Sequence, residues 1–96
     1  MKIRNFSHKG LKRLYSEDSE KGVPPSSADK LRNMLAYLDD MEDAEELRAL
    51  PVWNVHTLTG GRKGTWGLGV TRNHRLTFRI DAAEREVCDL DLEDYH

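Results

Sequence analysis

Residues 65–80 read TWGLGVTRNHRLTFRI and contain two runs in which apolar and polar side chains alternate. The apolar members of these runs are Trp66, Leu68, Val70, Leu76, Phe78 and Ile80. Alternation with a period of two predicts strands that bury one face and expose the other. The exposed face of the second strand then presents Arg75, Thr77 and Arg79, next to small glycines on the first strand. The sequence therefore predicts a positively charged sheet face with little bulk, on which a chain of phosphates could lie.

The surrounding segment, residues 52–80, contains no Asp or Glu, although charged residues make up 33% of the chain. Its basic and imidazole side chains are Arg62, Lys63, Arg72, Arg75, Arg79, His56 and His74. The formal net charge of the whole chain is only -2, so positive and negative charge are segregated along the sequence. A basic face beside acidic flanks is typical of proteins that bind a polyanion.

Length and composition indicate one globular domain that spans residues 1–96. A chain of 96 residues supports one modest core, and a hydrophobic content of 38% is typical of a soluble protein. The chain shows neither a membrane-spanning apolar run nor a signal peptide, so a cytoplasmic location without a membrane partner is expected. The single cysteine, Cys88, leaves no internal disulfide and is expected to be a buried, inert thiol. Four scattered histidines show no ligand spacing, so no metal or cofactor is expected.

The order of predicted elements indicates an α+β fold. A short strand is expected over residues 2–6, and Ser7 is expected to cap a helix over residues 8–15. A polar, proline-containing connector leads to a second helix over residues 29–49, capped by Ser26 or Ser27. Strands are then expected over residues 52–59, 65–71, 75–80 and 87–92, with a glycine-rich turn at residues 60–64. This pattern predicts two N-terminal helices packed on one face of a mostly antiparallel sheet of four to five strands.

Two charged helical surfaces allow two interpretations each. The rear half of the second helix is acidic, which suits a solvated face, although it could also repel RNA from that side. The first fourteen residues carry Lys2, Arg4, Lys9, Lys12 and Arg13 and no acid. These cations form either a solvated face or an extension of the basic surface.

Residues 93–96 read EDYH and place carboxylates, a phenol and an imidazole in consecutive positions. Imidazole suits proton transfer near neutral pH, and arginine binds phosphate through paired N–H donors. If this segment folds against the basic sheet, His56, Arg75, Tyr95 and His96 could surround one phosphodiester. RNA supplies its own nucleophile, the 2′-hydroxyl, so cleavage then needs a base, an acid and positive charge but no metal. From the residues alone, a ribonuclease and a simple polyanion-binding module both remain open.

Three segments resemble the HigB branch of the RelE superfamily, the "plasmid maintenance system killer" toxins of bacterial type II toxin–antitoxin modules. These segments are HTLTGGRKGTW at residues 56–66, RLTF at residues 75–78 and EDYH at residues 93–96. Residues 3–11, IRNFSHKGL, are similar to the opening of the same family, so the resemblance covers nearly the whole chain. The family fold, two helices packed on an antiparallel sheet, agrees with the element order predicted above.

The resemblance implies an mRNA interferase, a toxin that cuts mRNA in the A site of the 70S ribosome. It also implies a cognate helix-turn-helix antitoxin that neutralises the toxin and binds operator DNA, so that DNA is contacted only through the antitoxin. The positions that match family residues tied to activity are His56, Arg75, Asp94, Tyr95 and His96. By this resemblance His96 is the leading acid/base group, and His56 and Tyr95 assist proton transfer or orient the RNA. Arg75 would hold the scissile phosphate, and Asp94 would orient an imidazole or accept from the nucleotide.

Further residues are expected to contact RNA or to pack in the core. The expected RNA-backbone contacts are Arg62, Lys63, Arg72 and Arg79. Trp53 and Trp66 are expected to pack in the sheet or core rather than to stack on bases. The acidic residues of the last strand are unusual for an RNA surface, and Asp89 and Asp91 could pair with arginines across the sheet. Such pairs would reduce the positive potential of the face.

One position departs from the family pattern. Thr59 stands where a close family relative carries a lysine, and threonine cannot supply that cation. Arg62 or Lys63 in the same turn could compensate, although a displaced contact loses much of its value. Three hypotheses follow: a ribosome-dependent endoribonuclease toxin, a toxin-fold protein that binds RNA and antitoxin with little cutting, or a polyanion-binding module unrelated to toxins.

Overall fold

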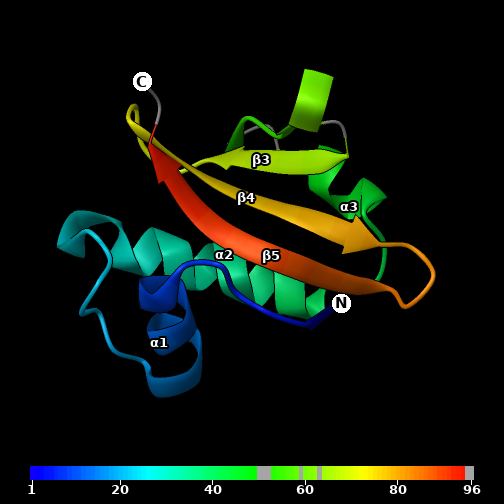
Figure 1. The fold of residues 1–96 in the computed structure, drawn as a ribbon. Coiled ribbons are helices and arrows are strands. Elements are labelled where there is room, and N and C mark those ends of the chain that lie inside the picture. Colours follow the sequence, from blue (N-terminus) through cyan, green and yellow to red (C-terminus); the bar gives the residue numbers. More distant parts are fainter. Residues whose placement is uncertain (50–52, 59, 63, 95–96) are drawn as a thin grey trace.

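One sheet with helices packed on one of its faces forms the fold, and the computed structural model describes residues 1–49, 53–58, 60–62 and 64–94 (Figure 1). The helices are α1 (Lys9–Glu17), α2 (Ala28–Asp40) and α3 (Glu45–Arg48), with short 3₁₀ turns at η1 (Pro25–Ser27) and η3 (Gly60–Arg62). The strands are β1 (Lys2–Ile3), β2 (His56–Thr57), β3 (Thr65–Gly69), β4 (His74–Asp81) and β5 (Glu86–Asp94).

The strand order is β1-β5-β4-β3-β2, so the first and last strands of the chain are neighbours in the sheet. Strand β1 runs parallel to β5, and every other neighbouring pair is antiparallel. The predicted class, two helices on a mostly antiparallel sheet of up to five strands, is therefore confirmed. Every helix among the described residues is too short or too polar to span a lipid bilayer.

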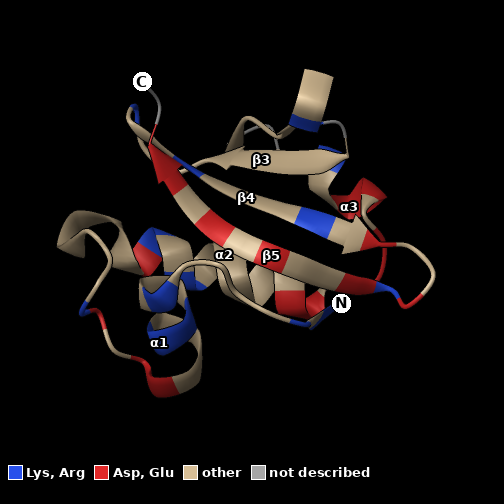
Figure 2. Cartoon of the chain, viewed as in Figure 1, with Lys and Arg blue, Asp and Glu red and all other residues tan. Residues whose placement is uncertain are grey.

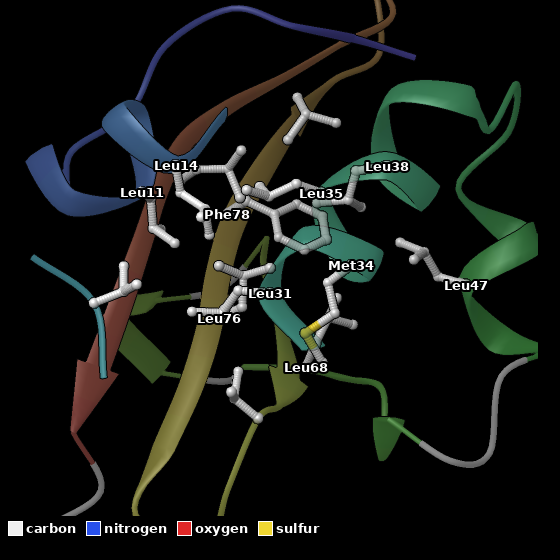
Figure 3. Packing of buried hydrophobic residues seen from close by; sticks show 14 of the residues in the cluster. Leu11, Leu14, Leu31, Met34, Leu35, Leu38, Leu47, Leu68, Leu76 and Phe78 are labelled. Carbon is white, nitrogen blue, oxygen red and sulfur yellow. The ribbon is translucent and has the colours of Figure 1, made fainter. Parts of the chain in front are cut away.

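The core lies between the sheet and the helices α1 and α2. Leu76 and Phe78 of β4 are buried on the same face as Leu68 of β3, as their alternation predicts. Figure 3 shows Phe78 surrounded by leucines of α1 and α2. Full burial of one such side chain contributes about 1.5–3 kcal/mol, so this face holds the sheet rigidly against the helices. The opposite face of β3 and β4 is not covered by α1 and α2 (Figure 1).

The second helix is shorter than predicted. It was expected over residues 29–49, but α2 ends at Asp40, Met41 is extended, and α3 is a separate turn. Acidic residues cluster at this end, where the helix dipole disfavours negative charge. The ammonium of Met1 donates to the carbonyl oxygens of Leu38 and Asp39 at 3.0 and 2.8 Å and also to that of Met41. The N-terminus of the chain therefore stabilises the break.

The cap of the first helix also differs from the prediction. His8, not Ser7, is the N-cap, and its Nδ1 accepts from the N–H of Leu11 at 3.1 Å. The backbone N–H of Ser7 instead donates to the carbonyl oxygen of Leu90 at 2.7 Å. The link between Ser7 and β5 shifts the start of α1 by one residue. The capping expected of Ser26 or Ser27 is likewise not made by Ser27, which occupies the cap position of α2 without a side-chain cap bond.

Strand lengths differ from the prediction in β1, β2 and β5. Among the described residues of the strand expected over 52–59, only β2 lies in the sheet, and Asn54 just before it adopts a left-handed turn with φ of 48°. The strand expected over residues 87–92 is longer, and its register against β4 shifts between Thr77 and Arg79. Asp89 has φ of 57° beside this irregularity, as expected for a β-bulge. The predicted N-terminal strand narrows to β1, and Phe6 makes only an isolated bridge to Leu90.

Candidate functional site

The sheet face away from the helices brings together residues from four strands. In the register, His56 lies opposite Gly67 and Gly69 lies opposite Arg75. Arg75 in turn lies opposite Glu93 of β5. Directly opposed residues, and residues two apart on one strand, share a face of the sheet. His56, Arg75 and Glu93 therefore project from the same face, with a glycine floor between the histidine and the arginine.

The His56 side chain is oriented by its own backbone. Nδ1 lies 2.9 Å from the carbonyl oxygen of Asn54, so the neutral ring carries its proton on Nδ1 and donates it there. This tautomer leaves Nε2 as an acceptor. A Cβ built on Gly67 would come within 3.3 Å of Nε2, so the ring lies over the glycine. The arrangement leaves the proton-accepting atom of His56 above the sheet face.

Arg75 belongs to an ion-pair cluster around Glu93. Arg62 of η3 donates to both carboxylate oxygens of Glu93, through Nη1 at 2.6 Å and through Nη2. Nη2 of Arg75 lies 3.8 Å from Oε1, and the hydroxyl of the buried Thr77 donates to Oε2. The Arg62 hydrogen bonds, aided by Thr77 and Arg75, lower the pKa of Glu93 to about 2 against the opposing effect of burial. Arginines and a carboxylate thus form one compact cluster on the candidate surface.

The charge distribution is mixed rather than purely positive. Figure 2 shows acidic bands along β5 directly beside basic bands on β4. Of the two residues proposed to neutralise the arginines, Asp89 contacts Asn5, whose Nδ2 lies 2.9 Å from Oδ1. Glu93 instead pairs with Arg62 and Arg75. The expected reduction of positive potential is present: Glu93 is its main source, and Asp91, one of the two predicted residues, contributes through its charge, since Glu93 and then Asp91 raise the pKa of Arg62.

A cleft of about 640 Å³ opens beside His56. Its lining residues are Lys30, Trp53, Asn54, His56, Gly69, Val70, Thr71 and Arg72, and no acid is among them. Nζ of Lys30 donates to the carbonyl oxygen of Val70 at 2.9 Å, which places this α2 cation at the end of β3. Lys30 was not predicted, because its place depends on how α2 crosses the sheet and no local sequence pattern marks it.

The other predicted site residues either lie away from the face of His56 and Arg75, are exposed, or fall outside the described residues. Asp94 ends β5 opposite His74, and strand alternation directs it to the face opposite that of Glu93. Arg72 and Arg79 are exposed. Tyr95, His96, Lys63 and Thr59 lie outside the described residues, so their assignments stay predictions.

Other predictions concern residues around this surface. Trp53 and Trp66 are partly buried against the core, as expected, with Trp53 edge-on to Tyr37 at 5.5 Å. Cys88 is buried, as expected, and burial raises the pKa of its thiol. Among the described residues, no three His, Cys, Asp or Glu side chains are grouped so that they could hold a metal ion.

Part of the N-terminal basic charge is neutralised locally. Arg4 pairs with Asp81 at 2.5 Å and with Glu86 at 2.8 Å. Lys2 lies 3.6 Å from the same glutamate. The other three cations of the first fourteen residues lie on α1 and are exposed, and Figure 2 shows their positions in blue on this helix.

Comparison with known proteins identifies relatives of the whole chain. A family model described as "RelE-like toxin of type II toxin-antitoxin system HigB" matches residues 4–96. The "Endoribonuclease HigB" of Proteus vulgaris is 34% identical over 94 residues, which cover 98% of this chain and 99% of that protein.

Solved structures show the same fold at low sequence identity. A "YoeB/ParE toxin" from Agrobacterium tumefaciens matches with a TM-score of 0.59 and 15% identity, covering 97% of this chain and 99% of the other. The "YoeB-YefM complex" from Staphylococcus aureus matches with a TM-score of 0.55 and 15% identity, covering 100% of this chain and 99% of the matched chain.

Proposed function

The chain belongs to the HigB-like family, the RelE-like toxins of type II toxin–antitoxin systems, and from this we propose that it is an endoribonuclease that cuts mRNA. The 34% identical relative named Endoribonuclease HigB supports the activity. The observation that carries the proposal for this chain is the shared face of His56 and Arg75, which are separated by a glycine floor. Family membership removes the hypothesis of a polyanion-binding module unrelated to toxins.

The proposed reaction is an intramolecular transesterification of the RNA backbone. The 2′-oxygen attacks the neighbouring phosphorus, the bond to the 5′-oxygen breaks, and the products carry a 2′,3′-cyclic phosphate and a 5′-hydroxyl. Nε2 of His56 supplies an acceptor for the 2′-hydroxyl proton, as its Nδ1–H contact to Asn54 supports. Arg75 stabilises the negative charge that develops on the phosphate oxygens. His96, with Tyr95 assisting, is proposed as the second proton-transfer group, which protonates the leaving 5′-oxygen.

The proposed substrate is mRNA in the A site of the 70S ribosome. The described part of this site is an open cleft beside the sheet, which would hold a flexible RNA chain only loosely by itself. A ribosome that already holds the mRNA in place would supply that alignment, which is worth several orders of magnitude in rate. We propose a cytoplasmic protein, neutralised by a helix-turn-helix antitoxin that alone contacts operator DNA.

One observation favours a second candidate, a toxin that binds RNA and antitoxin but cuts slowly. Arg62, one of the two cations expected to compensate for Thr59, is engaged by Glu93. A cation paired in this way contributes less to phosphate binding than a free one. This candidate predicts ribosome binding with little cleavage, and a gain in cleavage when Thr59 is replaced by lysine.

The deciding experiment is primer extension on mRNA paused in translating ribosomes, with full-length protein and a variant lacking His96. The full-length protein is expected to cut and to leave a 2′,3′-cyclic phosphate. The truncated protein should keep its ribosome affinity and lose about 10²–10⁴ in rate, the contribution of a positioned acid or base. Full activity without His96 would refute the assigned role. Binding without cleavage by the full-length protein would establish the second candidate.

A further inference from the structure

The carboxylate of Glu93 is bound by the same kinds of donor that would bind an RNA phosphate. Its two carboxylate oxygens accept hydrogen bonds from both terminal nitrogens of Arg62 and from the hydroxyl of Thr77. The guanidinium of Arg75 lies close to the same carboxylate. Guanidinium groups bind carboxylate and phosphate oxygens through the same paired geometry. The cluster is therefore an anion site whose anion comes from the protein itself.

The position of this internal anion is set by the fold. Arg75 and Glu93 are direct partners in the β4–β5 register, and Thr77 is two residues along the same strand. Arg62 reaches them from η3, which is 31 residues distant in sequence. The side chains of Arg75 and Glu93 each expose only 21% of their area, whereas that of Arg62 exposes 44%. Arg62 is thus the partner best placed to leave the cluster.

We propose that Glu93 occupies the phosphate site of the free toxin and keeps Arg62 and Arg75 aligned until RNA displaces it. The inference rests on the proposed function, since it assumes that Arg75 meets an RNA phosphate on this face. When RNA binds, the guanidinium of Arg62 exchanges its carboxylate partner for a phosphate. Glu93 therefore makes the surface selective for a ligand with several closely spaced phosphates, because a single weak anion cannot displace a carboxylate bound through so many contacts.

The first test is the binding of RNA by the variant Glu93→Gln. Glutamine has the shape of glutamate and retains one oxygen acceptor, but it carries no charge to compete with phosphate. The probe is a short fluorescent single-stranded RNA with 2′-O-methyl groups, which cannot be cleaved through the 2′-hydroxyl. Binding is measured by anisotropy at about 50–200 mM salt. The variant should bind at least about tenfold more tightly, since a charge-assisted competitor is removed.

The salt dependence separates competition from a merely structural role. If one further phosphate contact forms, the slope of log K against log salt steepens by about 0.7, the value for one charge on single-stranded RNA. Asp89→Asn is the matched control, because it removes one negative charge from the same strand at a residue paired with Asn5. Its effect should stay within about threefold at physiological salt, where charges without direct contact are screened.

A second measurement uses the unaltered protein and covers the case in which Glu93→Gln does not fold. The Arg62 Nε–H resonance is followed by NMR while the same RNA is added. It should shift as Arg62 changes partner, and the pKa of the Glu93 carboxyl should rise toward its usual range in the saturated complex. An unchanged Arg62 resonance and an unchanged Glu93 pKa at saturation would overturn the proposal.

The outcomes for the two proposals are distinct. Equal or weaker RNA binding by Glu93→Gln, or an effect no larger than that of Asp89→Asn, would overturn the role of Glu93. Those results would leave RNA cleavage by the wild-type protein untouched. Conversely, tighter binding by Glu93→Gln together with no cleavage by the wild type would support the role of Glu93 and overturn the proposed enzyme.

Discussion

The imidazole of His56 lies over Gly67, and a Cβ added to this glycine would come within 3.3 Å of Nε2 and 3.4 Å of Cε1. The two residues are direct partners in the register of β2 and β3. Because glycine has no Cβ, the ring can lie this close to the strand, and a methyl group here would push it outward by a few tenths of an ångström. Gly67 therefore sets the height of the proposed proton acceptor above the sheet.

Gly67→Ala is expected to displace the His56 ring by a few tenths of an ångström and to reduce cleavage at least tenfold, a fraction of the roughly 10²–10⁴ that a positioned base contributes. The unfolding free energy should change by no more than about 1 kcal/mol, because alanine is no less suited to a strand interior than glycine. Cleavage on programmed ribosomes and thermal unfolding measure the two effects. Gly61→Ala, where an added Cβ meets nothing within 4 Å, is the control. Unimpaired cleavage by Gly67→Ala would show that the ring height does not matter.

Arg75→Ala is expected to abolish growth arrest when the toxin is induced in bacteria. The side chain lies on the proposed phosphate-binding face but is only 21% exposed, so a stability loss of up to about 1 kcal/mol is expected from its pairing with Glu93. Growth curves and the melting temperature distinguish loss of chemistry from loss of folding. Lys21→Ala, which changes an exposed loop cation, should arrest growth like the wild type. Growth arrest by folded Arg75→Ala would remove this residue from the site.

The Glu93 cluster predicts part of the stability loss in acid. The folded-state pKa of Glu93 is lowered from 4.5 to about 2, so its contribution to the unfolding free energy is complete above about pH 5 and declines as the pH falls toward 2. Urea unfolding across this range should show a smaller acid decline for Glu93→Gln than for the wild type. The carboxyls of Asp81 and Glu86, whose pKa values Arg4 lowers, produce the decline common to both proteins. Identical pH profiles would exclude an ion pair at Glu93 in solution.

Gly10→Ala tests the packing of α1 against the connector that follows it. A Cβ on Gly10 would collide with the backbone carbonyl of Gly22, and a backbone cannot rotate away as a flexible side chain can. The unfolding free energy should fall by about 1–3 kcal/mol, the usual cost of overpacking. Denaturant unfolding measures this loss, with Gly61→Ala again as the control. In an unconstrained helix, alanine is more stabilising than glycine. A gain in stability would therefore contradict the close approach of Gly10 to the Gly22 backbone.

The sequence determined those features that depend on local periodicity. Alternation in residues 65–80 was enough to assign β3 and β4, to place Leu76 and Phe78 inside and to place Arg75 on the open face. Helical spacing was enough to find α1 and most of α2. These inferences hold because one buried face per element imposes its period on neighbouring residues, whatever the rest of the chain does.

Features that depend on distant segments required the tertiary structure. The ammonium of Met1 stabilises the break at Met41, and the cap at His8 follows from the backbone bond between Ser7 and Leu90. The Arg62–Glu93 pair joins residues that no sequence spacing relates. An arginine in an acid-free stretch looks like a free cation, but only packing brings a carboxylate against it. The sequence thus established where the positive charge lies, and the fold decided how much of it is already neutralised.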